Sequence, residues 1–350
     1  MAEFTVGFWN LQNLFDTTAS AIAADLEFTP AEGWTDAVLE QKLDNLAAII
    51  NLMHNGGPDL LGLCEVENKE VMERLIAKLA RQDYKLAHVD SPDIRGIDTT
   101  LVYSSTIFEL DGDPVPHLVH LRYPTRDIFQ VPLRVKATQD KLTVLVNHWP
   151  SRSQGKYESE PYRITVANHC GRIADGILKK SRTAFLALPD TAGEMSELQS
   201  KWNENILIMG DLNDEPFDRS VLNELQAGNG EDKIEEPLKS ATGHELPSPK
   251  TYLGLKAYFF NYMWKFLGEP DRGSYYFSGS VNTMNMLDQF IVSRGLYFGL
   301  SGLQVKNGSV DIFRPTVMQS GSKKRPKAFD RKTGKGYSDH FPIVMVLETV

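Results

Sequence analysis

Short apolar runs and longer stretches with one apolar face alternate along the chain. The run Ile206–Met209 is typical of a buried strand. A helix is predicted over 36–53, because leucine, isoleucine and methionine recur there every three or four residues and Thr35 is suited to cap it. Further helices are predicted over 69–80, 162–178 (after Pro161) and 219–225. Further strands are predicted over 4–9, 59–64, 84–89, 99–103, 107–110, 128–135, 142–146, 285–292 and 341–347.

Alternating strands and amphipathic helices predict an α/β fold. Several of the middle strands follow one another without a helix, which requires antiparallel pairing, so a mixed sheet or two packed sheets is expected. Residues 183–204 are ambiguous. We expect a single domain over 1–350, with an insertion of little regular structure at about 227–280. The aromatic residues of that insertion favour a local core, and base stacking is the alternative.

Polar side chains stand where the predicted strands end. Asp211 and Asn213 follow the 206–210 strand, and in an extended chain residues two apart point to the same side. A plain turn would also explain them, since Gly-Asp and Asn-Asp-Glu-Pro are good turn sequences. Because sites in α/β proteins gather at one end of the sheet, we expect the strand-end groups to converge. The other members are Asn10, Glu65, His148, Asp288, Asp339 and His340.

These residue types suit a cation and a phosphate. Glu65, Asp339 and Asn10 offer the oxygen ligands that Mg²⁺ prefers, and Mn²⁺ is a possible substitute. Such an ion acts as a Lewis acid on a phosphoryl oxygen or a leaving group. The sequence therefore predicts a magnesium site at this end of the sheet.

The remaining strand-end groups suit the chemistry of hydrolysis. His340 is the best candidate for a general base, with Asp288 as its carboxylate partner. His148 could hydrogen-bond the phosphoryl oxygen or protonate the leaving group. Asp211 could orient the attacking water, and Asn213 could donate to the phosphate.

Six motifs in this order resemble the endonuclease/exonuclease/phosphatase superfamily, the DNase I-like hydrolases. The resemblance implies a four-layered α/β sandwich with two packed mixed sheets flanked by helices, and Mg²⁺-dependent phosphoester hydrolysis. It also implies that Asn10 and Glu65 lie at the metal, that Asp339 is a further acid on the metal side, and that Asp288 and His340 form the base pair. The motifs are Trp9-Asn10, Leu63-Cys64-Glu65, Asn147-His148, Gly210-Asp211-Leu212-Asn213, Leu287-Asp288 and Ser338-Asp339-His340.

The finer resemblance is to bacterial members that open with Asn-x-x-Asn-Leu-Phe-Asp, here Asn10–Asp16. Gln12 departs from the abasic-site endonucleases, which tend to carry an acid there. Arg95, Arg152 and Asn147 are softer candidates for contacts with the substrate phosphate. The basic segment 323–335 borders the last motif, and it is either a solvated loop or a phosphate-gripping arm.

Composition narrows the function further. The net charge is −9, and residues 321–350 hold seven basic and three acidic residues (+4), which leaves −13 for the first 320. Such an acidic body argues against a protein that coats nucleic acid over a broad face. The two cysteines support neither a zinc site nor a disulfide framework. We see no signal peptide, no membrane span and no sign of a protein partner, so a cytoplasmic location is expected.

We therefore expect a metal-dependent phosphodiesterase of the nuclease type. Its substrate would be a phosphoester, with nucleic acid as the first expectation. A phosphatase or phosphodiesterase for small molecules or lipid headgroups is the alternative. A non-catalytic phosphate-binding module is a third possibility, disfavoured because no expected catalytic residue is missing.

Overall fold

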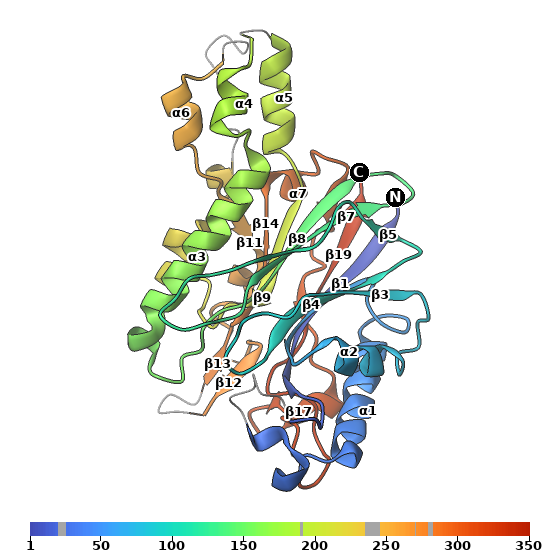
Figure 1. Ribbon diagram of the computed structural model, residues 1–350. Helices are drawn as coiled ribbons and strands as arrows, with labels where there is room; N and C mark the ends of the chain where they lie inside the picture. The colour runs from blue at the N-terminus through green and yellow to red at the C-terminus, as the bar shows by residue number, and fades with distance from the viewer. Residues whose placement is uncertain (20–25, 190–191, 235–245, 270, 279–282) are drawn as a thin grey trace.

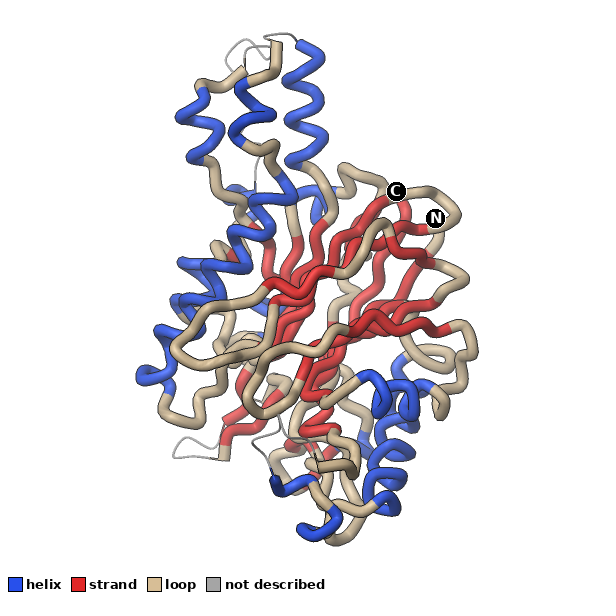
Figure 2. Tube along the Cα trace, in the orientation of Figure 1, coloured by secondary structure: helices blue, strands red, loops and turns tan. Residues whose placement is uncertain are grey.

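The computed structural model describes residues 1–19, 26–189, 192–234, 246–269, 271–278 and 283–350. Two mixed β-sheets pack face to face, and helices cover their outer faces (Figures 1 and 2). This arrangement confirms the predicted α/β sandwich. Within the described residues, no helix is both long and apolar enough to cross a bilayer.

The first sheet joins the two ends of the sequence. Its strand order is β15-β19-β1-β2-β4-β3, with β16 also paired to β19. The central strand β1 lies parallel to β2 and antiparallel to β19, so Glu3 pairs with Glu348 and the two termini lie side by side (Figure 1). The strands are β1 (Glu3–Leu14), β2 (Leu60–Val66), β3 (Tyr84–His88), β4 (Asp98–Ser104), β15 (Leu303–Val305), β16 (Asp311–Ile312) and β19 (Ile343–Thr349).

The second sheet has the order β10-β11-β14-β9-β8-β7-β5, with β6 paired to β7. Strand β9 lies parallel to β8 and antiparallel to β14. The strands are β5 (Phe108–Leu110), β6 (Val115–His117), β7 (Ile128–Val135), β8 (Lys141–His148), β9 (Ile206–Asp211), β10 (Ala227–Gly228), β11 (Phe259–Asn261) and β14 (Asp288–Val292). Two small hairpins stand apart, β12 (Tyr275–Phe277) with β13 (Thr283–Asn285) and β17 (Gln319–Ser320) with β18 (Arg325–Pro326).

The helices largely follow the apolar pattern. Helix α1 (Asp36–Met53) is as predicted, and the Thr35 side chain accepts the N–H of Val38 as its cap. Helix α3 (Lys156–Leu178) begins before its predicted start and contains Pro161. The remaining helices are α2 (Lys69–Ile76), α4 (Arg182–Leu186), α5 (Ala192–Trp202), α6 (Pro249–Gly254), α7 (Arg294–Phe298), a π-helical turn at Ser220–Glu224 and 3₁₀ turns at Leu26–Phe28, Pro30–Glu32, Glu231–Ile234, Tyr262–Phe266 and Thr316–Met318.

The prediction of little regular structure over 227–280 is wrong in part. Strands β10 and β11 lie in this segment and extend the second sheet beyond β14, and α6 and β12 lie there too. Residues 235–245, 270 and 279–280 of the segment fall outside the described residues. Phe259 and Tyr252 are buried, in agreement with a local core.

Alternation along β9 decides where its last side chain points. Leu207 and Met209 belong to the core between the two sheets, whereas Ile206 and Ile208 pack in the core on the α3 side. Because side chains alternate between the faces of a strand, Asp211 points toward the first sheet. A carboxylate therefore ends a row of side chains that is otherwise apolar.

Gly210 precedes this carboxylate, and its neighbour leaves no room for a side chain. A Cβ at this position would lie 2.2 Å from the carbonyl oxygen of Asn147 on the adjacent strand. We expect Gly210→Ala to lower the free energy of unfolding by more than about 2 kcal/mol, because backbone must move. Urea titration would measure it.

Gly176 on α3 is the matched control. It is exposed, and a Cβ there would meet no atom within 4 Å. Gly176→Ala should be neutral or stabilising by about 0.5–1 kcal/mol, since alanine favours the helix. Equal effects of the two substitutions would contradict the packing argument.

Candidate active site

Three neighbouring strands of the second sheet bring three polar side chains into one row. Asp211 is paired with His148 of β8 on one side and with Asp288 of β14 on the other. Residues paired across strands face the same side of a sheet. All three side chains therefore point into the space between the two sheets, and all three are buried.

Asn10 and Glu65 enter the same space from the first sheet. Asn10 follows Phe8 at the alternating spacing, and Phe8 contacts the intersheet position of Gly62. Glu65 would point the other way in a regular strand. It adopts a left-handed backbone (φ 60°) at a register shift between β2 and β4, which re-aims its side chain.

The amide of Asn10 joins the acids of both sheets. Its Nδ2 donates to Glu65 Oε1 at 3.2 Å and to Asp211 Oδ2 at 3.1 Å, while its Oδ1 accepts the N–H of Gln12 at 2.9 Å. The acceptor role of Oδ1 fixes which end of the amide faces the acids. Asn10 therefore turns its NH₂ group toward these acids. The sequence predicts Asn10 as a metal ligand, but only its Oδ1 could bind a cation, and Oδ1 accepts the Gln12 N–H.

His340 and Asp288 form a buried pair. Nδ1 of His340 lies 2.7 Å from Oδ2 of Asp288, and Nε2 lies 3.7 Å from Oδ2 of Asp211. Burial opposes the charge of His340, but Asp288 and Asp211 outweigh burial and raise the pKa of His340 well above its ordinary value. The backbone N–H of His340 donates to Ser338 Oγ, which in turn donates to the carbonyl of Asn10.

His148 is the neutral counterpart of His340. Its Nε2 lies 3.7 Å from Oε1 of Glu65 and 3.9 Å from Oδ2 of Asp211. Burial, reinforced by the charges of Arg126 and Arg95, lowers the pKa of His148 well below its ordinary value. A neutral imidazole among acids can donate a hydrogen bond without carrying charge.

Nearby positive charge does not compensate for the burial of Asp211 and Asp339. Burial raises the pKa of Asp211 to about 7, with His340 opposing and Asp288 reinforcing the shift. Burial also raises the pKa of Asp339, where His340 opposes and Glu65 reinforces it. Neighbouring carboxylate oxygens are the donor set that a hard divalent cation fits. Glu65, Asp339 and Asp211 are the residues that could hold one.

Arg152 and Asn213 support the loop after β9. Nε of Arg152 donates to the carbonyl of Asn213 at 2.5 Å, and its Nη2 lies 2.9 Å from Asp218 and 3.3 Å from Asp214. The Nδ2 of Asn213 donates to the carbonyl of Trp149, and its N–H donates to Asp211 Oδ1. These bonds favour a positioning role for both residues over the direct phosphate contacts that the sequence suggests.

Asn147 and Arg95 differ in their placement. Asn147 is fully buried, one residue before His148 and so on the opposite face of β8, where it donates to Leu145 O and accepts from the Trp149 indole. This position argues against a phosphate contact. Arg95 reaches the site's edge, where its Nη2 donates to Asn13 Oδ1 at 2.7 Å. Asn13 N donates to Glu65 Oε2, so Arg95 lies one residue from the acids.

Two residues near the site carry weak sequence signals. Buried Arg126 donates to the carbonyls of His148 and Trp149 and to Asp93, and no motif contains it. The ring of Tyr275 lies 4.8 Å from that of His340, and the two residues form an isolated β-bridge. Tyr275 stands in an aromatic stretch of the sequence. Its pairing with the distant His340 leaves no pattern in the residues around it.

Lys42 is a further residue that the motifs do not include. It is buried on α1, and its Nζ donates to the carbonyls of Gln12 and Asn13, which both have left-handed backbones. A lysine within the apolar stripe of the predicted helix is the signal that could have found it.

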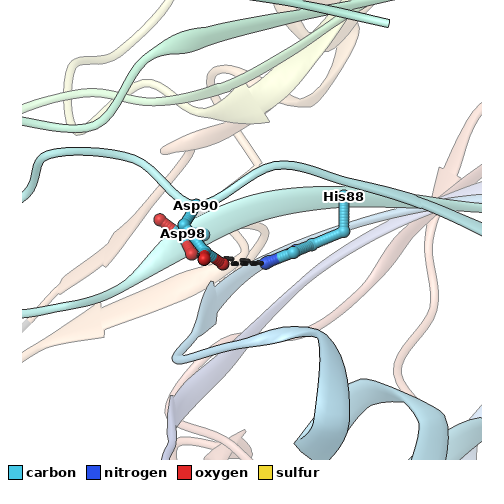
Figure 3. A group of neighbouring side chains, drawn as sticks. All are labelled: His88, Asp90 and Asp98. Atoms are coloured by element: carbon cyan, nitrogen blue, oxygen red, sulfur yellow. Dashed lines mark hydrogen bonds and ion pairs between the residues drawn. The ribbon is translucent and has the colours of Figure 1, made fainter. Parts of the chain in front are cut away.

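A second cluster of possible ligands lies where β3 and β4 meet the loop that carries Arg95. His88 Nε2 points at Asp90 Oδ1 (3.0 Å) and Asp98 Oδ2 (3.4 Å) (Figure 3). Burial lowers the pKa of His88 and raises that of Asp98 to about 7. Asp98 Oδ1 also accepts the N–H of Ser91. Hydrogen bonds account for this cluster, and we assign it to loop structure.

Sequence comparison identifies the family. The model of the "Endonuclease/Exonuclease/phosphatase family" matches residues 5–197 and 194–349. The chain belongs to this family. Members of the endonuclease/exonuclease/phosphatase family are hydrolases of phosphoesters and generally depend on divalent metals. No curated protein matches the chain in sequence.

Solved structures share the fold of this family member at low identity. One is an endonuclease/exonuclease/phosphatase family protein from Bacteroides thetaiotaomicron (14% identity, TM-score 0.54, 99% of this chain and 97% of that one). A humanized TDP2 from D. rerio (12%, 0.53, 99% of both) and a mannosyl-6-phosphatase from Bacteroides thetaiotaomicron (15%, 0.53, 99% of both) are also similar.

Divalent cations should stabilise the folded protein. A cation that binds the crowded acids only in the folded state contributes RT ln(1 + [L]/Kd), about 2.7 kcal/mol at 100 times Kd. We therefore expect Mg²⁺ or Mn²⁺ to raise the Tm over its value in EDTA, as thermal shift would measure, and Glu65→Gln to remove most of that rise.

The exposed Glu73 on α2 provides the control, because it pairs with Lys69 at the surface. Glu73→Gln should keep the full metal-dependent rise. A rise of the same size in Glu65→Gln would show that the cation binds elsewhere.

Proposed function

We propose that this protein is a divalent-cation-dependent phosphodiesterase that hydrolyses nucleic acid. The His340–Asp288 pair, which faces Asp211 beside Glu65 and the neutral His148, is the observation that carries the proposal. A base, an acid that can hold water and a hydrogen-bond donor thus surround one space. This is the equipment that an in-line attack of water on phosphorus requires.

His340 acts as the general base in this proposal. Asp288 accepts its Nδ1–H, which leaves Nε2 facing the space beside Asp211. The 3.7 Å separation from Nε2 to Asp211 suits a water molecule that contacts both groups. His340 must be neutral to take a proton. Sharing the acids with a cation weakens their hold on the imidazolium proton and so favours the neutral state.

His148 and the acids act on the phosphate. A divalent cation at Glu65, Asp339 and Asp211 would supply Lewis-acid stabilisation of the charge on a phosphoryl or leaving oxygen. His148, which its low pKa keeps neutral, donates a hydrogen bond from Nε2–H to a phosphoryl oxygen or to the leaving oxygen. Asn10 keeps Glu65 and Asp211 at their spacing through the amide that contacts both.

Local positive charge supports a nucleic-acid substrate. Residues 321–350 carry +4 in a chain of net charge −9, and their basic segment, 323–335, closely precedes Asp339 and His340. A phosphatase for small phosphoesters is the second candidate, and the charge of −13 on the first 320 residues favours it. Assays of plasmid DNA, single-stranded DNA, RNA and bis-p-nitrophenyl phosphate with Mg²⁺ and Mn²⁺ at fixed ionic strength distinguish the two.

Replacing the base tests the mechanism. We expect His340→Ala to lower kcat by about 10²- to 10⁴-fold, the usual contribution of general acid–base catalysis. Asp288→Asn should lower kcat as well, because it removes the carboxylate that orients the imidazole. Turnover of bis-p-nitrophenyl phosphate under saturating Mn²⁺ would measure both.

His169 is the matched control, since it lies on α3 and outside the row of strand-end residues. His169→Ala should keep wild-type kcat. Wild-type turnover in His340→Ala, unaffected by EDTA, would rule out the proposed mechanism.

A further inference from the structure

A pocket of about 420 Å³ adjoins the acids on the side of β1. Asn13 connects the two, because it lines the pocket and its N–H donates to Glu65 Oε2 at 2.8 Å. The pocket and the acids are therefore separated by a single residue. The pocket is lined by Gln12, Asn13, Glu27, Phe28, Trp34, Lys42, Phe329, Asp330, Arg331 and Lys332.

Hydrogen bonds between distant segments hold the pocket in shape. Gln12 contacts the backbone of Phe329 at both ends of its amide: Oε1 accepts the Phe329 N–H at 2.8 Å, and Nε2 lies 3.5 Å from the Phe329 carbonyl. Arg331 donates to the carbonyl of Glu27 at 2.7 Å. Asn45 of α1 donates to the carbonyls of Gly334 and Gly336. The basic segment is thus bound to the body of the protein, which disfavours a loose arm.

The floor of the pocket combines aromatic rings with a buried cation. The Lys42 ammonium lies 5.6 Å from the ring centre of Trp34 and 5.3 Å from that of Phe329. Phe28 forms a half-buried wall and stacks on Phe15, with ring centres 4.3 Å apart. An ammonium has three donors, and the carbonyls of Gln12 and Asn13 account for two within the described residues.

The rim adds further charge. Arg331 and Lys332 stand there with Glu27 and Asp330. Glu27 lies 4.0 Å from Arg331, and Asp330 Oδ1 accepts the Lys332 N–H. Arg331 and Lys332 balance these two acids, and Lys42, whose pKa burial lowers to about 7, adds partial positive charge, so the pocket suits an anionic ligand with a flat apolar part.

We propose that this pocket binds one unpaired nucleotide of a single-stranded nucleic acid, next to the phosphate that is cleaved. Aromatic walls with neighbouring cations are the usual features that bind single strands, and the volume suits a ligand of this size. A paired base cannot enter, because its faces are covered by the stack and its edge by its partner. This inference rests on the proposed function and narrows it to single strands or strand ends.

A second cavity is also lined by aromatic residues, but it does not adjoin the acids. It is larger, about 610 Å³, and Phe260, Tyr262 and Tyr297 line it. Phe260 pairs with Val292 at the end of β14 opposite Asp288, so this cavity lies away from the acids. It serves as the site for matched control substitutions.

Two substrates that differ by a nucleoside test the pocket by kinetics. For the p-nitrophenyl ester of thymidine 5′-phosphate, we expect Phe28→Ala and Lys332→Gln each to raise KM, Phe28→Ala by about tenfold as for the loss of one base stack. The KM for bis-p-nitrophenyl phosphate should change less than about twofold, because that substrate has no base to stack. The kcat for either substrate should also change less than about twofold. The control Tyr262→Ala should change neither KM. Equal KM changes for the two substrates would overturn the proposal.

Binding tests the pocket separately from turnover. In a His340→Ala background with Mg²⁺, fluorescence anisotropy should show labelled hexathymidylate binding at least about tenfold more tightly than a labelled blunt-ended hairpin duplex, and Phe28→Ala should remove most of this preference. Equal affinity for strand and duplex, or an unchanged preference in Phe28→Ala, would overturn the pocket. If neither ester is hydrolysed, the proposed function fails, and the binding result still decides the pocket.

Discussion

The amide of Asn10 is the contact on which the site depends, because it bonds to an acid from each sheet. Without a donor between them, Glu65 and Asp211 would approach as two buried negative charges, and like charges at short range in a poorly solvated space repel strongly. The Nδ2 group separates them with two hydrogen bonds, and the Gln12 N–H fixes the amide's orientation. One side chain thus bonds to both acids and links the two sheets at the site.

Backbone irregularity concentrates around this contact. Gln12, Asn13, Glu65 and Asn213 all adopt left-handed conformations with φ between 51° and 60°, although none is glycine. Non-glycine residues rarely adopt this region, and the surrounding structure must compensate for it. Lys42 supplies part of that compensation at Gln12 and Asn13, whose carbonyls it holds. Regular strands alone would leave Glu65 pointing away from Asp211.

Local alternation predicts the strands and the row of polar strand ends, whereas the sandwich itself is what the family resemblance implies. The alternation of apolar residues in β9 is enough to place Asp211 on the face of the second sheet that points away from α3. The same alternation in β8 places His148 and Asn147 on opposite faces. The early start of α3 and the bulge at Glu65 escape such counting, because long-range contacts override local preference there. Tyr275 could not be placed, since its partner His340 is 65 residues away. The roles of the site residues remain predictions.

The pairing of β1 with β19 has a consequence for synthesis in the cell. Strand β1 contains Asn10, but its antiparallel neighbour is made last of all the described strands, directly after His340. Contacts so distant in sequence form late, since the intervening chain must first be brought together. A nascent chain on the ribosome therefore carries Glu65 and Asp211 long before it carries His340. The row of strand-end residues is therefore completed only after the last of the described strands has been made.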